Sequence, residues 1–257
     1  MTLSTRALTL TVPGRTLVSG LDVQIAPGQC WAILGENGSG KSRLLLALAG
    51  LRKPASGDVQ LDGTPLAARP RRELAREVGI LLQEEPEVFW GGVLDYVLLG
   101  AFPHGRLAPG GAPDAAAREA LAATDLAGHA LQPYRTLSGG ERQRARIAQL
   151  LVQSPAHVLL DEPLNHLDLR HQIAAMETFA ALARSGRAVA MALHEPWLAA
   201  RYCDHALLLY DSTRFSAGPS SELLAREALE RLYGCPFDAF ADPGSRPVPI
   251  DRAAHTS

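Results

Sequence analysis

Aromatic side chains, cysteine and net charge are all scarce in this chain of 257 residues. Aromatic residues make up 5% of it, and its 25 basic and 27 acidic residues nearly cancel. That balance gives no electrostatic argument for nucleic-acid binding. The 3 cysteines, Cys30, Cys203 and Cys235, are far apart and odd in number, so we expect free thiols rather than disulfides or a zinc site.

Long apolar runs are missing as well. The longest, at residues 44–49 and 188–193, are far shorter than a membrane span. The N-terminus lacks the charged and then apolar pattern of a signal peptide. With 47% hydrophobic residues the chain can nevertheless bury a sizeable core. We therefore expect a cytoplasmic protein that acts at a membrane only through a partner.

Short apolar strands alternate with helical patterns along most of the sequence. Turn signals and periodicity predict helices at 42–51 and 71–77, and mostly helix from 93 to 153 with a Pro/Gly-rich loop at 103–113. The alternation indicates an α/β core with a mainly parallel sheet, interrupted by a helical insertion. Strands are expected at 8–12, 21–25, 31–34, 58–63, 78–83, 158–160, 188–193 and 206–210.

Residues 35–42, the phosphate loop, fit the pattern G-x-x-x-x-G-K-[ST], which holds nucleotide phosphates. The helix expected after the loop supplies free N–H groups and a partial positive charge. Lys41 would bind the β- and γ-phosphates, and the Ser42 hydroxyl would bind Mg²⁺. The alternative is a glycine-rich turn without a ligand. The nucleotide-binding residues expected are Gly35, Glu36, Asn37, Gly38, Ser39, Gly40, Lys41, Ser42, Arg43 and Asp161.

Two carboxylates follow the apolar strand at 158–160. Ligands bind at the carboxyl ends of parallel strands, which places Asp161 and Glu162 near the phosphate loop. Asp161 would hold Mg²⁺, and Glu162 would act on the attacking water as general base. A strand that ends in Asp-Glu-Pro can also be an ordinary turn; the phosphate loop favours the functional interpretation.

Residues 137–143, the signature segment, read Leu-Ser-Gly-Gly-Glu-Arg-Gln and open a helix. Ser138 and Glu141 can form a capping box, which is a purely structural explanation. The double glycine, Gly139 and Gly140, would also leave bare N–H groups at a positive helix end, which makes a second anion site. Two chains arranged head to tail would use both sites, each signature helix covering the nucleotide of the partner.

The phosphate loop, Gln83, the signature segment, Asp161-Glu162 and His194 occur in the order of an ABC transporter ATPase. The resemblance covers residues 8–234. It implies ATP and Mg²⁺ as ligands, a homodimer, an integral membrane permease and a substrate-binding protein in the wider complex. It also implies one ABC ATPase domain, 1–240, with an N-terminal antiparallel β subdomain. The core would comprise 1–86 and 156–240, the helical subdomain about 87–155, and a flexible tail 241–257.

The resemblance also assigns roles to single residues. Gln83 would contact Mg²⁺ and the attacking water, and His194 would contact the γ-phosphate. By itself His194 is only a histidine after an apolar strand, which is more often structural. Asp168 lies in a segment similar to the loop that crosses the dimer interface. The implied set is Glu162, His194 and Gln83 as catalytic residues, Ser42, Gln83 and Asp161 at Mg²⁺, and Ser138, Gly139, Gly140 and Asp168 at the ATP of the partner.

The sequence departs from the family pattern at two positions that usually contact the adenine base and the α-phosphate of ATP. Val12 occupies the place of the aromatic residue that usually stacks on adenine. Arg43 stands where a second hydroxyl residue usually follows Ser42, and it could supply a charge there or point away. How adenine is held is therefore open.

Three segments, at 100–104, 165–172 and 232–234, resemble importers of iron-siderophores, haem and cobalamin. Ala101 replaces an arginine of that pattern, and these residues can also be common surface residues of the family. Residues 84–99 would receive the permease, with Phe89, Trp90 and Tyr96 exposed; ordinary core packing is the alternative.

These observations predict a cytoplasmic ATP-binding subunit of an ABC importer for a metal chelate, peripheral on the inner face of the membrane. Other readings are an importer subunit for another substrate, or a soluble ABC ATPase in translation or DNA repair. The short helical insert and neutral charge argue against the soluble protein. A kinase or GTPase would not need the signature segment, and the guanine-specifying Asn-Lys-x-Asp is absent from the sequence.

Overall fold

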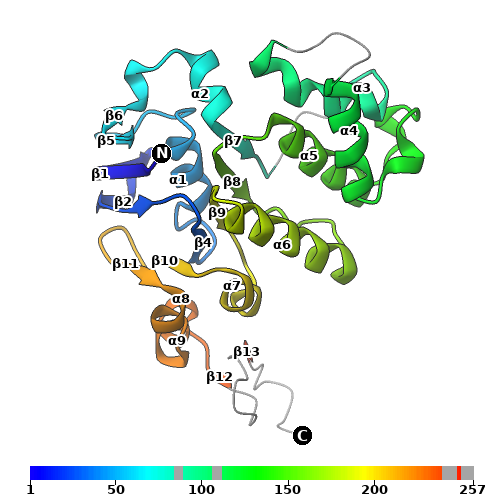
Figure 1. Ribbon diagram of the computed structural model, residues 1–257. Helices are drawn as coiled ribbons and strands as arrows, with labels where there is room; N and C mark the ends of the chain where they lie inside the picture. The colour runs from blue at the N-terminus through cyan, green and yellow to red at the C-terminus, as the bar shows by residue number, and fades with distance from the viewer. Residues whose placement is uncertain (84–88, 106–111, 239–247, 250–257) are drawn as a thin grey trace, which may run out of the picture.

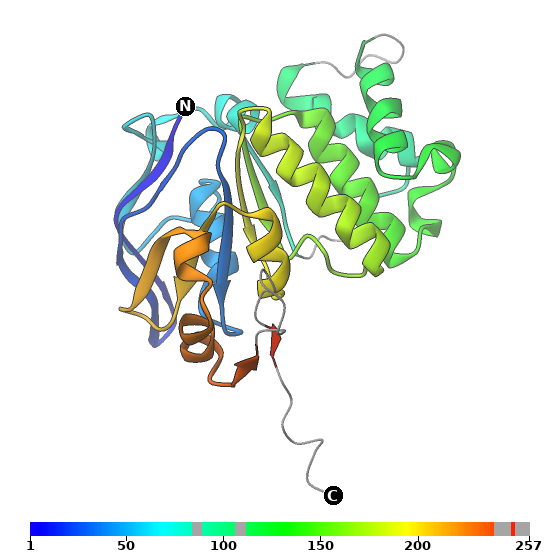
Figure 2. The ribbon, with the colours of Figure 1, turned by 60° about the horizontal axis from the view of Figure 1, so that its bottom comes forward.

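The computed structural model describes residues 1–83, 89–105, 112–238 and 248–249. Two main β-sheets, a two-stranded pair near the C-terminus and a set of helices make up this part of the chain (Figure 1). The helical group, α3 to α5, lies beside the larger sheet, away from the smaller one (Figure 2). The mixed α/β class and the antiparallel N-terminal sheet that were expected are confirmed.

The smaller sheet is antiparallel and has the order β2-β1-β5-β6, with β3 also paired to β1. The strand expected at 21–25 is wrong, because Leu21 ends β2 and a new strand begins at Gln24. Between them the Asp22 carboxylate accepts a hydrogen bond from the Ala7 backbone, which interrupts the ladder. The strands are β1 (Leu3–Val12), β2 (Arg15–Leu21), β3 (Gln24–Ile25), β5 (Ser56–Leu61) and β6 (Thr64–Pro65).

The larger sheet has the order β11-β10-β4-β9-β8-β7 and is parallel except at β11. Its inner strands β4, β8 and β9 are buried along their whole length, as expected for a sheet covered on both faces. The antiparallel edge strand β11 was not anticipated. The strands are β4 (Cys30–Gly35), β7 (Val78–Leu81), β8 (His157–Asp161), β9 (Ala188–Ala192), β10 (His205–Leu209) and β11 (Phe215–Pro219).

Helices cover both faces of the larger sheet. On one face α1 (Lys41–Leu48) packs Leu44, Leu45 and Leu48 between the two sheets. The other face is covered mainly by α6 (Leu169–Arg184), with α7 (Pro196–Tyr202) and α9 (Arg226–Tyr233). The short helices α2 (Arg71–Glu77), α8 (Ser220–Leu223) and η1 (Leu66–Ala68) complete this half. The expected helix at 71–77 is confirmed residue for residue.

The helical group has an apolar core of its own, to which Val93, Val97 and Leu121 contribute. Its elements are α3 (Val93–Leu98), η2 (Leu99–His104), α4 (Ala112–Ala123), η3 (Ala127–His129), η4 (Tyr134–Thr136) and α5 (Gly139–Gln153). The mostly helical stretch predicted at 93–153 is therefore confirmed. Where the subdomains begin and end stays a prediction.

Two of the three aromatic residues expected at an exposed face belong to this core. Tyr96 is 6% exposed and stacks on Tyr134, with ring centroids 4.1 Å apart. Phe89 packs edge-on against the same two rings. Only Trp90, 78% exposed, is on the surface. The reason is that three rings at contact distance bury more apolar area together than they would on separate sites.

Of the tail expected at 241–257, only Val248–Pro249 (β13) falls within the described residues, where it pairs with Phe237–Asp238 (β12). Part of the loop expected at 103–113, and residues 84–88 of the expected permease face, also lie outside them. Among the described residues, no helix has both the length and the apolar character that crossing a membrane requires.

Candidate active site

The phosphate loop connects the buried strand β4 to α1 and wraps around the first residue of that helix. The Lys41 ammonium donates hydrogen bonds to the carbonyl oxygens of Gly35 (2.7 Å) and Glu36 (3.2 Å). Gly35 must be glycine, because a Cβ there would meet the Leu209 carbonyl oxygen at 2.8 Å. Gly40 has a φ of 107°, a conformation that side chains rarely adopt. The loop is thus shaped as a tight turn with Lys41 folded inside it.

Burial lowers the pKa of Lys41, although the nearby carboxylates of Glu162 and Asp161 work in the opposite direction. Together these three groups bring one positive and two negative charges to the end of the sheet. An anionic ligand would balance the charge of Lys41, and a divalent cation bound with it would balance the two carboxylates.

Asp161 ends β8 and faces the start of α1. Its Oδ1 accepts a hydrogen bond of 2.9 Å from the Ser42 hydroxyl. Desolvation raises the pKa of Asp161, partly offset by that hydrogen bond. A hydroxyl and a carboxylate with phosphate oxygens nearby form the hard oxygen donor set that Mg²⁺ takes in nucleotide sites. No cluster of three or more His, Cys, Asp or Glu in the described residues could hold a metal by itself, so the ion would need the phosphates.

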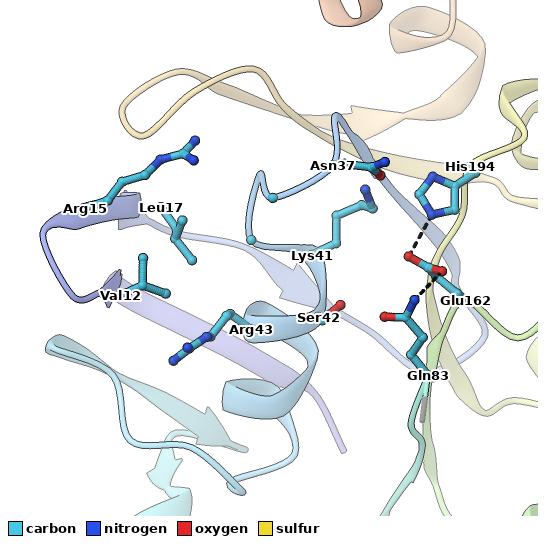
Figure 3. Close-up of a pocket in the computed structure, with 12 residues that line it drawn as sticks. Val12, Arg15, Leu17, Asn37, Lys41, Ser42, Arg43, Gln83, Glu162 and His194 are labelled. Carbon is cyan, nitrogen blue, oxygen red and sulfur yellow. Dashed lines mark hydrogen bonds and ion pairs between the residues drawn. The ribbon is translucent and has the colours of Figure 1, made fainter. Parts of the chain in front are cut away.

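Glu162 is the centre of a small network. Its Oε2 accepts hydrogen bonds from the side-chain amides of Gln83 (2.9 Å) and Asn165 (2.8 Å). Its Oε1 lies 2.7 Å from His194 Nε2, which donates because a carboxylate can only accept (Figure 3). Glu162 itself has a φ of 49°, in the left-handed region that non-glycine residues avoid. Such strain persists where the surrounding structure enforces it, and it clusters at functional sites.

Burial by itself would raise the pKa of Glu162, but the hydrogen bonds from Asn165 and His194 outweigh it and leave the pKa below its usual value. Glu162 is therefore ionised at neutral pH. An ionised carboxylate held by three donors has a fixed orientation and retains lone pairs for a water molecule.

A cavity of about 590 Å³ opens beside these groups. Gln83, Glu162 and His194 line it on one side of Lys41 and Ser42, and Val12, Arg15 and Leu17 line it on the other (Figure 3). Asn37, Gly38, Gly40 and Arg43 complete the lining. The cavity is therefore elongated past the phosphate loop, with a carboxylate end and an end formed by the β1–β2 hairpin.

The signature segment opens α5 at some remove from this cavity. Ser138 Oγ accepts from the Glu141 backbone (3.3 Å), and the Glu141 carboxylate accepts from the Ser138 backbone (2.7 Å), so the expected capping box is present. The pKa of Glu141 is lowered mainly by the hydrogen bond from the Ser138 backbone and, next, by the one from the Ser138 side chain. Ser138, Gly139 and Gly140 do not line the cavity of their own chain. Ser138 and Gly139 are exposed.

Two close approaches connect the signature helix to the turn that follows β8. The buried Gln143 amide donates to the Pro163 carbonyl (2.8 Å), directly after Glu162. A Cβ on Gly140 would come within 2.8 Å of the His166 carbonyl oxygen, so no side chain fits there. Packing against His166 therefore explains why residue 140 is glycine, in addition to the anion site that the sequence suggested. Asp168, two residues after His166, caps α6 through the His171 backbone (2.9 Å) and is exposed.

Residues 18–165, more than half of the chain, match the family model described as ABC transporter. The chain belongs to the ABC transporter family. It is 40% identical over 244 residues to the hemin import ATP-binding protein HmuV of Myxococcus xanthus, covering 92% of this chain and 91% of that one. The HmuV of Bordetella pertussis is 38% identical over 252 residues, covering 95% and 96%.

Solved structures agree with these sequence relatives. A transporter described as being of the metal-chelate type, in an inward-facing conformation, matches with a TM-score of 0.82 at 26% identity and 98% coverage of both chains. CbiO1 of Clostridium perfringens, part of the transporter complex cbiONQ, matches at 0.75 and 27% identity, over 89% of this chain and 92% of that one. The resemblance inferred from the motifs is thus confirmed, and this ABC protein is an ATPase domain.

Within the ABC fold, the predicted site residues fall into two groups. The cavity brings together Asn37, Lys41, Ser42, Arg43, Gln83, Glu162 and His194, with Asp161 behind Ser42. Ser138, Gly139, Gly140 and Asp168 are elsewhere on the same chain, as a site shared between two copies would require.

Sequence reasoning missed three residues of the site. Asn165 was quoted only as part of a segment, yet it holds Glu162. Its position three residues after the carboxylate, within a turn, was the available signal. Arg15 and Leu17 were overlooked because the strand that carries them, β2, was not expected.

Proposed function

We propose that this chain is the ATP-hydrolysing subunit of an ABC importer that takes up haem or a similar metal chelate. The observation that carries the cargo assignment is identity of 38–40% over nearly the full length with proteins named for hemin import. The full-length fold match to a transporter of the metal-chelate type points in the same direction.

In this proposal the triphosphate of ATP lies along the phosphate loop. Residues 35–42 surround the phosphates with backbone N–H groups and the Lys41 ammonium, and Arg43 adds a second cation beside the cavity. Ser42, Asp161 and Gln83 hold Mg²⁺. Mg²⁺ bound there would offset the negative charge of the phosphates. The 2.9 Å contact between Ser42 and Asp161 supports this assignment, because it places two oxygen donors side by side.

Glu162 orients the attacking water and accepts its proton. Support comes from its lowered pKa, which keeps it ionised, and from the three donors that fix it. His194 and Gln83 would exchange their bonds to Glu162 for contacts to the γ-phosphate and to Mg²⁺ when ATP enters. A residue that changes partners in this way can report whether the γ-phosphate is present.

Two copies of the chain would bind ATP between them. Ser138, Gly139 and Gly140 would cover the phosphates bound to the partner, with Asp168 crossing the interface. The exposure of Ser138 and Gly139 and their absence from the lining of their own cavity support the arrangement, since the partial positive charge at the start of α5 suits a phosphate beside the Glu141 carboxylate of the capping box.

A permease and a substrate-binding protein would complete the transporter, with the ATPase at the inner face of the membrane. Trp90 (78% exposed) and Phe102 (62% exposed) are large apolar residues on the helical group that a permease loop could cover. Trp90 lies in the segment that the sequence assigned to this role.

The decisive test is reconstitution. The chain and the permease encoded with it are assembled in proteoliposomes with the cognate binding protein, and ATP-dependent entry of haem is measured beside that of a ferric siderophore and cobalamin. We expect uptake of one of these chelates with ATP, and none with the Glu162→Gln variant. ATP hydrolysis that no permease stimulates, or association with ribosomes or DNA instead, would contradict the proposal.

A further inference from the structure

The nucleotide cavity has no aromatic residue where a base would lie. Among its described lining residues there is no Phe, Tyr or Trp. Yet a triphosphate on Lys41 with its γ-phosphate toward Glu162 must extend its nucleoside in the opposite direction. That direction leads to Val12, Arg15 and Leu17 (Figure 3).

The β1–β2 hairpin holds these three side chains on one surface. Val12 pairs directly with Arg15 across the two-residue turn of Pro13 and Gly14. Directly opposed residues of an antiparallel pair lie on the same face, and so do residues two apart along a strand. Leu17, two residues after Arg15, is buried and packs near Gly40, because a Cβ there would meet Leu17 Cβ at 3.1 Å. The hairpin therefore presents two apolar side chains and one planar cation.

Arg15 is directed at the phosphate loop. One of its terminal nitrogens lies 4.0 Å from where a Cβ on Gly38 would be. The side chain is exposed, and no hydrogen bond or ion pair within the described chain engages its guanidinium. A guanidinium without a carboxylate partner is free to stack on a ring, and its planar shape and weak hydration suit that contact.

We propose that Arg15 binds the adenine ring of ATP, stacking its guanidinium on one face of the base while Val12 and Leu17 contact it as apolar neighbours. The proposal rests on the ATP site described above and adds to it the residue that recognises the base. It assigns to a cation the contact that the family usually makes with an aromatic ring.

The test separates the base from the phosphates. Binding of Mg·ATP and of Mg·ribose 5′-triphosphate, which lacks adenine, is measured by calorimetry for the full chain. Arg15→Ala should weaken ATP binding roughly 3- to 30-fold, the range of a cation–π contact, and leave ribose triphosphate binding unchanged. Arg15→Trp should restore ATP affinity, because a ring can stack as well. Arg15→Lys keeps the charge but not the plane and should recover little of it.

Arg6→Ala is the matched control, because Arg6 is an exposed arginine of the same sheet that does not line the cavity. It should leave both ligands unaffected. An equal loss for ATP and ribose triphosphate in Arg15→Ala, or full recovery in Arg15→Lys, would overturn the proposal in favour of a phosphate contact. No loss for either ligand would also overturn it. Failure of the ATP site itself would look different, since the unmodified chain would then bind neither ligand.

Discussion

The phosphate loop and the signature segment are both turns into a helix, but they differ in how they are satisfied within one chain. The loop is enclosed: Lys41 bonds to its own backbone, and Ser42 bonds to Asp161 from another strand. The signature end is exposed, and the Ser138 hydroxyl and backbone N–H are bonded to Glu141 of the same helix. The loop is therefore held by contacts within the chain, whereas the start of the signature helix is open to solvent. In the proposed dimer, the loop would bind ATP within one chain, and the signature end would meet a nucleotide only on a second copy.

The largest effect is expected at the enclosed half. Glu162→Gln removes the proton acceptor but keeps the shape, so turnover should fall roughly 100-fold or more. ATP binding should persist, and an ATP-bound dimer should accumulate. Phosphate release and size-exclusion chromatography with ATP measure the two effects. Glu73→Gln, at an exposed position of α2, serves as the control. Normal turnover in Glu162→Gln would contradict the role assigned to this carboxylate.

The second-largest effect is expected for Lys41→Ala. The variant loses a charged donor to the phosphates, which corresponds to roughly 10- to 100-fold weaker ATP binding. Calorimetric titration of the monomer is sufficient, because the loop would bind ATP within one chain. The exposed Lys53 provides the comparison, and Lys53→Ala should bind ATP as before. Unchanged affinity in Lys41→Ala would mean that the loop is not the phosphate site.

Ser138→Arg tests the exposed signature end. A long cation at this helix end should block closure of the dimer and lower turnover about 10-fold, while monomer affinity for ATP stays the same. Ser221→Arg, at an exposed position of α8, controls for added charge. If Ser138→Arg hydrolysed ATP with undiminished cooperativity, the head-to-tail arrangement would be ruled out.

The smallest effect is on stability. Ser138→Ala removes the side-chain cap of α5 and should cost about 1 kcal/mol of unfolding free energy in urea. The pKa of Glu141 is lowered in the folded chain, so its contribution is present above the unfolded carboxyl pKa and is lost as pH falls through the folded value. The difference between the unmodified chain and Glu141→Gln should therefore shrink between pH 7 and about pH 3. A constant difference would show that the cap does not depend on the charge.

Local sequence signals predicted most of the sheet and helices, because buried strands such as β4 and β9 are continuous apolar runs between turns. The strand at 21–25 failed for the opposite reason. Its alternation is genuine, but Asp22 bonds to a distant backbone N–H and breaks the ladder. The edge strand β11 is only partly buried and has no such run, so periodicity gives little indication of it.

At the candidate site, too, residues in local motifs were predictable from the sequence, whereas residues placed by distant contacts were not. Lys41, Ser42, Asp161 and Glu162 were predictable because motif spacing encodes their geometry. Tyr96 could not be placed from sequence, because its burial depends on Tyr134, far along the chain. Arg15 depends on hairpin register, which a pattern of residue types does not give.

The amide of Gln143 has a wider consequence. It donates a hydrogen bond from the helix that would cover the partner's nucleotide to Pro163, the residue after Glu162, the proposed general base. In the proposed pair of copies, this hydrogen bond would connect the helix end at one nucleotide to the carboxylate at the other, so that a displacement of either would be transmitted to the other. Such a connection would make the two hydrolysis events interdependent even though their phosphates never touch.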